Sequence, residues 1–205
     1  MRPDLRSTTA DLAAPPHFYE RWGKRVVDLM LAVPVAILSA PLAAMVSLLV
    51  WAEDRGPSIF RQERVGRDGA HFTIRKFRTM PVNTANVPSA DANGLQITRV
   101  GRVLRRTSLD EIPQIVSVLN GDMSVVGPRP PIPAQQNLVD LRRQSGSLRL
   151  RPGLTGLAQV NSFDGMTDEE KTAWDTRYAG TISLATDLRI LMRTVGYLLR
   201  KPPQY

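Results

Sequence analysis

The sequence predicts an α+β protein: an N-terminal re-entrant membrane helix, then a small, mostly helical globular domain with one short β-hairpin and interfacial amphipathic helices. Three observations predict this fold class. They are a long uncharged run near the N-terminus, an alternating pattern around a Gly-containing turn, and helically spaced leucines near the C-terminus. We expect four segments: an N-terminal extension over 1–23, the membrane helix over 24–55, the globular domain over 56–200 and a tail over 201–205.

Composition limits the available chemistry. The 205 residues fit one domain, and 42% hydrophobic content is enough to form a core. Cysteine is absent and there are two histidines, which excludes disulfides, thiolate metal sites and thiol catalysis and leaves little imidazole chemistry. A net charge of +8 suits an anionic partner, whether nucleic acid, anionic lipid or a phosphorylated substrate. Any catalysis must rest on carboxylates, hydroxyls and bases.

The uncharged run extends over 23 residues, from Leu29 to Trp51. As a helix it would be about 35 Å long, which exceeds the roughly 30 Å hydrocarbon core of a bilayer. A straight transmembrane anchor and a cleaved signal peptide are alternative readings. The charged region before the run is long and the run exceeds a usual signal-peptide core, so the signal-peptide reading is the weaker one.

Two features favour a re-entrant helix over a straight span. Pro34 and Pro41 each remove a backbone donor, so we expect a bend near Ser39-Ala40-Pro41, where the Ser39 hydroxyl supplies a hydrogen bond. Basic residues also flank both ends of the run, whereas a spanning helix carries its Lys/Arg excess on one side. Both ends on the cytoplasmic side would explain this distribution.

A hairpin is predicted over residues 57–80, because two alternating segments flank Gly66-Arg67-Asp68-Gly69. The following stretch, Pro81 to Gly94, is rich in Asn, Ala, Ser and Pro and is predicted as a surface loop. A basic helix from Arg99 to Arg106 then leads into a short apolar helix that ends at Asn120-Gly121.

Two clusters of proline and glycine follow, Gly127–Pro131 and Arg151–Gly156, and we expect both to be fixed loops that present an arginine on a stiff backbone. Near the C-terminus a helix is predicted from apolar residues at helical spacing: Leu184, Leu188, Leu191, Val195 and Leu198. Such a helix is typical of a membrane surface and equally typical of a packed core.

Asp110 and Glu111 are the acids with the most distinctive context. Ser108 to Glu111 fits a capping box, in which Ser108 caps a helix and Glu111 returns a hydrogen bond, and this reading explains both acids without a function. Pro113 weakens it, because its ring would oppose the carbonyl of Leu109. In the functional reading, Asp110 is a nucleophile toward phosphorus, with nearby cations neutralising the phosphates.

Four motifs occur in order along the chain: Lys76–Met80, Ser108–Glu111, Gly121–Pro130 and Arg151–Gly156. Together they resemble the monotopic phosphoglycosyl transferases, the bacterial sugar transferase family that starts polysaccharide and glycoprotein glycan assembly. The resemblance runs from about Lys24 to Arg200 and is closest to the minimal catalytic form. It departs at the membrane bend, where the family has Ser-Pro and this chain has Ser39-Ala40-Pro41.

The resemblance implies a ping-pong reaction at the cytoplasmic face of the bacterial inner membrane. Asp110 would attack the sugar-linked phosphate of a UDP-sugar, and undecaprenyl phosphate would accept the phosphosugar. Glu111 would assist as a base or at the metal, and Mg²⁺ would be a cofactor with Asp110 as a ligand. The basic residues that match family motifs are implied to contact phosphate or nucleotide: Lys76, Arg105, Arg129 and Arg151.

A different class of function is a membrane-anchored basic module that binds anionic lipid or nucleic acid without catalysis. Aromatic residues for base stacking are few, at 6%, so we expect membrane lipid and not nucleic acid as a partner. A third reading is a soluble protein with a buried apolar hairpin. The sequence is compatible with an oligomer and does not identify the sugar.

Overall fold

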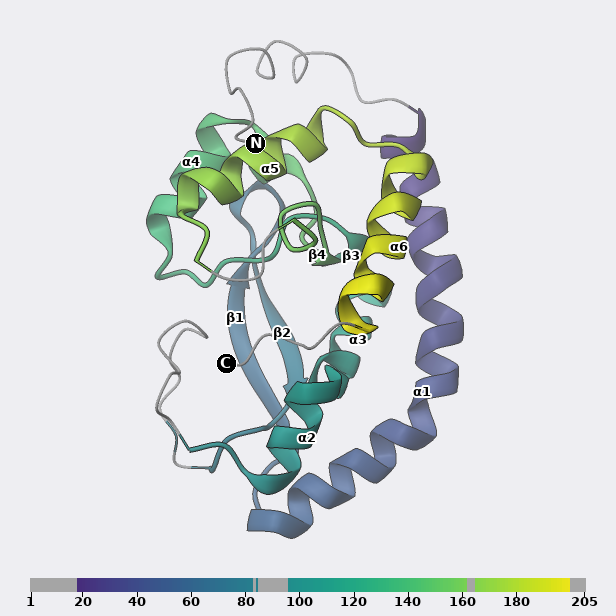
Figure 1. The fold of residues 1–205 in the computed structure, drawn as a ribbon, viewed down its shortest axis with the longest axis vertical. Coiled ribbons are helices and arrows are strands. Elements are labelled where there is room, and N and C mark those ends of the chain that lie inside the picture. The colour runs from purple at the N-terminus through teal and green to yellow at the C-terminus, as the bar shows by residue number, and fades with distance from the viewer. Residues whose placement is uncertain (1–17, 83, 85–95, 162–164, 200–205) are drawn as a thin grey trace.

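The computed structural model describes residues 18–82, 84, 96–161 and 165–199. Helical elements alternate with two small sheets (Figure 1). The longer helices are α1 (Lys24–Asp54), α2 (Arg99–Thr107), α3 (Ile115–Asn120), α4 (Gln136–Gln144), α5 (Asp168–Ala179) and α6 (Leu184–Leu199). The short turns of helix are η2 (Tyr19–Gly23), η3 (Arg67–Gly69), η5 (Leu109–Gln114) and η6 (Ser147–Arg149). The strands are β1 (Ile59–Val65), β2 (His71–Phe77), β3 (Ser124–Val126) and β4 (Gly153–Thr155).

Helix α1 runs along the whole length of the molecule and changes direction partway (Figure 1). Pro34 and Pro41 lie inside it, and both are residues that bend a helix. The helix is not interrupted, and the Ser39 hydroxyl makes only a long contact of 3.4 Å to the carbonyl of Ala36. The helical segment begins at Tyr19, before the predicted start of the membrane helix.

Both halves of α1 pack against the rest of the chain. Ala32 lies in a buried cluster with residues of β2 and α3, and Val46 and Val50 lie in another with Phe77 and Leu104. The middle of the helix, between Ala32 and Val46, has no fully buried residue. The exposed face of α1 is rich in large apolar side chains: Met30, Val33, Val35, Ile37, Leu38, Met45, Leu48 and Leu49. By length and composition, Tyr19–Asp54 is the one described helix that meets the requirements for crossing a membrane.

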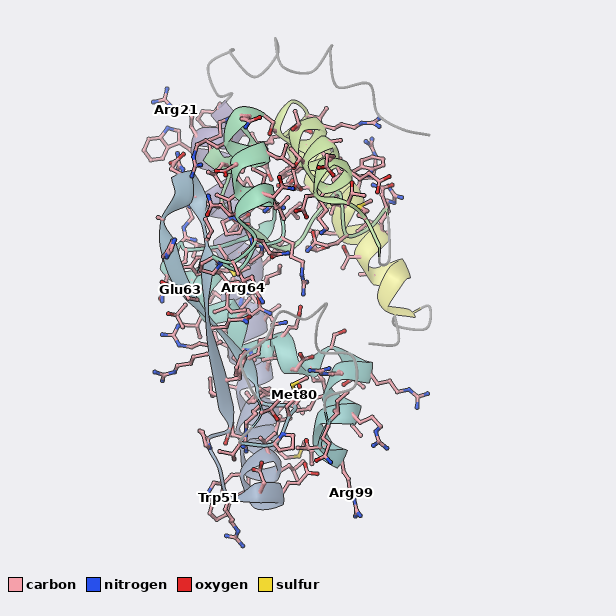
Figure 2. All side chains as sticks on the ribbon, turned by 90° about the vertical axis from the view of Figure 1, so that its left-hand side faces the viewer. Arg21, Trp51, Glu63, Arg64, Met80 and Arg99 are labelled. Atoms are coloured by element: carbon pink, nitrogen blue, oxygen red, sulfur yellow. The ribbon has the colours of Figure 1, made fainter. Side chains whose placement is uncertain are left out.

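The predicted hairpin is confirmed. Strands β1 and β2 pair antiparallel, with Ile59 opposite Phe77 and Val65 opposite His71. Side chains alternate between the two faces of a strand, so Arg64 and Lys76, opposite Phe72 and Phe60, share the face that carries the buried Ile74. In Figure 2 Arg64 lies between the ends of the molecule marked by Arg21 and Trp51.

The capping-box reading of Ser108 to Glu111 is wrong. Ser108 adopts a left-handed conformation with φ 55°, ends α2 and makes no side-chain capping bond. The two acids lie in the 3₁₀ helix η5, and regular α-helix begins only at Ile115, after Pro113. The predicted end of this helix is confirmed, because Gly121 follows α3 with φ 92°.

The expectation that both Pro/Gly clusters are loops is wrong for the second one. Gly153–Thr155 forms strand β4, which pairs parallel to β3. The backbones approach so closely that a Cβ on Gly153 would lie 2.1 Å from the backbone nitrogen of Gly127. Glycine is therefore required for the contact that joins the two clusters. The loop predicted over 81–94 lies almost entirely outside the described residues, as does the tail 201–205.

The remaining helices close the domain beside β3 and β4. Helices α4 and α5 pack together, and α6 lies against the second sheet (Figure 1). Helix α6 packs into the core through Ile190, while Leu184, Leu188, Met192 and Val195 are exposed on the opposite side. Contact of this exposed side with a membrane surface stays a prediction. Asp187, which is 3% exposed, accepts hydrogen bonds from Lys24 and two tyrosines and so joins α6 to α1.

Candidate active site

The 3₁₀ helix η5 presents Asp110 and Glu111 beside β2. The left-handed Ser108 turns the chain out of α2, and η5 then lies along the inner side of the hairpin. The Nζ of Lys76 donates to Oε1 of Glu111 at 2.7 Å, and the two side chains are 16% and 32% exposed. The motifs that begin at Lys76 and Ser108 therefore meet in space, although 35 residues separate the two charges in sequence.

Glu111 is the fixed member of the pair. Burial alone would raise the pKa of its carboxyl, but the charges of Lys76 and Arg129 and hydrogen bonds from Lys76 and Gln114 lower the pKa to about 2. Glu111 is therefore ionised near neutral pH. A carboxylate this weakly basic is a poor general base near neutral pH.

Asp110 is the available member. Within the described chain its carboxylate makes no ion pair, and its hydrogen bond comes from its own backbone N–H. Burial raises the pKa of Asp110, the charge of Lys76 lowers it, Glu111 raises it and Arg105 lowers it, and the net direction is upward. A partly buried carboxylate that is flanked by cations but bound by none is well suited to react with, or coordinate, an incoming group.

Arg129 joins Lys76 and Glu111 in one shallow hollow. Its lining brings together β1, β2, η5 and both Pro/Gly clusters, through Arg64, Ile74, Lys76, Glu111, Gln114, Arg129, Pro130, Gly153 and Leu154. Three cations and one carboxylate line this hollow, so its net charge is positive and it suits a phosphorylated ligand.

Two lining residues were missed by the sequence reading, Arg64 and Gln114. Arg64 is 7% exposed, and its burial together with the charge of Arg129 lowers its pKa to about 10, against the opposing effect of Glu111. The strand alternation that puts Arg64 and Lys76 on one face was available in the sequence. Nothing in the sequence pointed to Gln114, because its hydrogen bond to Glu111 depends on the 3₁₀ conformation of η5.

Arg105 approaches the other acid. Its Nε donates to the hydroxyl of Thr79 at 2.9 Å, and its charge lowers the pKa of Asp110. Thr79 belongs to the same motif as Lys76. The motif therefore supplies Lys76 itself and also holds Arg105 through the Thr79 hydroxyl. Arg105 lies on α2, which η5 directly follows.

Arg151 neither lines the hollow nor is among the charges that shift the pKa of Asp110 or Glu111. Burial lowers its pKa, as do the charges of Arg67 and Arg25, and Asp28 opposes them. Neither Asp110 nor Glu111 is among its electrostatic neighbours. Ser39 and Pro41 lie in α1 and not beside the pair, as expected for residues assigned to a bend.

A fully protein-built metal site is absent from the described residues, which hold no group of three or more His, Asp or Glu side chains arranged to bind an ion. Mg²⁺ usually takes one or two carboxylates and completes its shell with water and substrate phosphates. Asp110 fits such a role, because its carboxylate is not bound by a cation, whereas Glu111 is held by Lys76.

A carboxylate pair among cations, on a domain that carries one long apolar helix, is the arrangement expected of an enzyme that acts on phosphorylated substrates at a membrane. The chain belongs to the bacterial sugar transferase family, whose family model matches residues 19–201.

Relatives of established name fall in the same family. The chain is 42% identical to the UDP-glucose:undecaprenyl-phosphate glucose-1-phosphate transferase of Caulobacter vibrioides, over 89% of this chain and 72% of the relative. It is 36% identical to the exopolysaccharide production protein ExoY of Sinorhizobium fredii, over 84% of this chain and 83% of the relative. It is 35% identical to the undecaprenyl-phosphate galactose phosphotransferase of Salmonella typhimurium, over 90% of this chain but 42% of the relative.

Proposed function

We propose that this chain transfers a sugar-1-phosphate from a UDP-sugar to undecaprenyl phosphate, as the first membrane step of polysaccharide or glycan assembly. The observation that carries the proposal is the difference between the two acids. Lys76 binds the carboxylate of Glu111, whereas the carboxylate of Asp110 lies near cations without forming an ion pair in the described chain. The named relatives support the substrate class, since their names specify glucose or galactose phosphate and undecaprenyl phosphate.

In the first half-reaction an Asp110 carboxylate oxygen bonds to the sugar-linked phosphorus of the donor. The bond from that phosphorus to the bridging oxygen breaks, and UMP leaves with the electron pair. In the second half-reaction an oxygen of undecaprenyl phosphate attacks the same phosphorus. The acyl phosphate bond then breaks, the Asp110 carboxylate is restored, and the product is undecaprenyl diphosphate sugar.

The surrounding residues lower the charge repulsion in both steps. Lys76 and Arg129 face the phosphates from the hollow, and Arg105 stabilises ionised Asp110. Glu111 orients Lys76 and, with its low pKa, serves this role better than that of a base. Asp110 would hold Mg²⁺ together with the donor phosphates, and the ion would supply further charge neutralisation.

The arrangement of α1 supports a re-entrant helix at the cytoplasmic face of the inner membrane. Both of its halves pack against the same domain, which is the packing expected of a helix whose two ends lie on the same side of the membrane. The unburied middle around Pro34 and Pro41 is the part that would enter the lipid. The exposed apolar side of α6 would rest at the membrane surface, which would bring the site close to the lipid acceptor.

The test is UMP release by the purified chain in detergent with Mg²⁺, undecaprenyl phosphate and a panel of UDP-sugars. The proposal expects release that depends on the lipid acceptor for at least one donor and is lost in Asp110→Asn. Lipid-dependent release that persists in Asp110→Asn would contradict Asp110 as the nucleophile. Vesicle binding with no release from any donor would instead favour a non-catalytic membrane module.

A further inference from the structure

The segment that carries Arg129 has an unusual hydrogen-bonding pattern. Pro128, Pro130 and Pro131 have no N–H, so the segment cannot be fixed by donating hydrogen bonds from these positions. Instead, each carbonyl from Pro128 to Pro131 accepts a hydrogen bond from elsewhere in the fold. The donors are, in order, the N–H of Gly153, Nη1 of Arg142, Nη1 of Arg64 and the N–H of Val65, each 2.9 Å from its acceptor.

Arg142 is itself fixed by a buried partner. Its Nε and Nη2 both donate to Oδ2 of Asp175, at 2.9 and 2.6 Å, and its Nη1 donates to the Arg129 carbonyl. The side chains of Arg142 and Asp175 are 4% and 2% exposed. The planar guanidinium therefore connects α4, α5 and the Arg129 backbone in one geometry and has no room to turn.

The Arg129 side chain has no comparable support. It is exposed, and within the described chain its guanidinium makes no hydrogen bond or ion pair. It nevertheless lines the hollow beside Lys76 and lowers the pKa of Glu111. The backbone therefore fixes the point from which this side chain extends into the hollow, and Arg142 is the residue that holds the Arg129 carbonyl.

We infer that Arg142, fixed by Asp175, is a positioning residue that holds the Arg129 backbone so that the Arg129 guanidinium faces the phosphates of the donor. The inference rests on the proposed function for the ligand, and on this structure for the geometry. Arg142 does not line the hollow and does not contact the acid pair, so it acts only through the carbonyl of Arg129.

Removing Arg142 alone would leave the Asp175 carboxylate buried without a partner and would endanger folding. The test variant is therefore Arg142→Met combined with Asp175→Leu, which replaces the pair by apolar side chains of similar size. The matched control is Arg143→Met with Asp140→Leu, which removes an exposed ion pair from the same helix α4. Thermal unfolding in detergent checks that each variant is folded.

We expect the Arg142/Asp175 variant to lose about 100-fold in kcat/KM for the UDP-sugar, as for a catalytic group displaced by about 1 Å. We expect the control to keep wild-type kcat/KM. The decisive comparison repeats the change in an Arg129→Met background, where it should lower kcat/KM further by less than about twofold. A folded variant with wild-type kcat/KM, or an equal loss in both backgrounds, would overturn the inference.

A second readout does not depend on turnover. The dissociation constant of inorganic pyrophosphate, measured by isothermal titration calorimetry in detergent, should rise in the Arg142/Asp175 variant and in Arg129→Met, without a further rise in the combined variant. If wild-type protein releases no UMP, the proposed function fails while pyrophosphate binding still decides the inference. Wild-type affinity for pyrophosphate in the folded Arg142/Asp175 variant would contradict it.

Discussion

The pKa of the Asp110 carboxyl group is shifted in opposite directions by its surroundings. Burial and the charge of Glu111 raise its pKa, while Lys76 and Arg105 lower it. As a nucleophile it must be ionised, so activity falls as the pH drops through its pKa. Because that pKa is raised, the acid limb of kcat/KM should lie above the range of an ordinary aspartate.

Two substitutions should move this acid limb in opposite directions. Lys76→Met removes a positive charge, raises the pKa of Asp110 and shifts the limb to higher pH. Glu111→Gln removes a negative charge, lowers the pKa of Asp110 and shifts the limb to lower pH. Both variants should lose rate, since Lys76 and Glu111 hold each other in place. The pH dependence of kcat/KM measures both shifts, and shifts in the same direction would contradict this account of the pair.

At the residue scale, the resemblance assigned Lys76, Asp110, Glu111, Arg105 and Arg129 to one site, and the structure brings these residues near one another. Their roles stay predictions. The sequence could not separate the tasks of the two acids, because the difference comes from a 3₁₀ turn that points Glu111 at Lys76. Arg142 gave no signal, because its hydrogen-bonding partner Asp175 is 33 residues away in sequence and meets it only in the folded protein.

Helix α1 is the element on which the membrane account depends. The chain has no cysteine, so single-cysteine variants can report on each end of the helix. We expect Arg21→Cys and Pro57→Cys, both at exposed positions, to react with an impermeant maleimide in inside-out vesicles and not in intact cells. Asn137→Cys on α4 is the control for the domain side. Labelling of either end from outside intact cells would show a spanning helix.

The element scale also shows which patterns carry over from sequence to structure. The hairpin was predictable because alternation and a Gly-containing turn are local signals, and its register follows from them. The pairing of β3 with β4 was not, because it joins segments 29 residues apart through three-residue strands whose contact depends on glycine packing. The capping motif predicted at Ser108 was likewise wrong, because Ser108 adopts a left-handed conformation and ends α2.

At the scale of the whole molecule, Asp187 joins α1 to the rest of the domain. Its carboxylate accepts hydrogen bonds from Tyr19, Lys24 and Tyr178, and the Lys24 and Asp187 side chains are 13% and 4% exposed. Asp187→Ala leaves Lys24 without its partner, and breaking a buried pair costs about 3 kcal/mol or more. We expect that loss in the free energy of unfolding, measured with denaturant in detergent.

The matched control for this prediction is Glu63→Ala. Glu63 pairs with His71 on the outer face of the hairpin, and both side chains are more than half exposed, at 60% and 52%. Exposed pairs of this kind contribute little to stability, so the free energy of unfolding should hardly change. Equal effects of the two substitutions would show that Asp187 is not a joint between α1 and α6.

The central claim is that Asp110 carries the phosphosugar during transfer, and mass spectrometry of the protein with donor but without lipid acceptor tests it most directly. After brief incubation with Mg²⁺ and an accepted UDP-sugar, acid quenching and proteolysis, the account predicts a phosphosugar adduct on the peptide that contains Asp110. The adduct should disappear on adding undecaprenyl phosphate and should be absent from Asp110→Asn. An adduct on another residue, or one that forms equally in Asp110→Asn, would contradict the account.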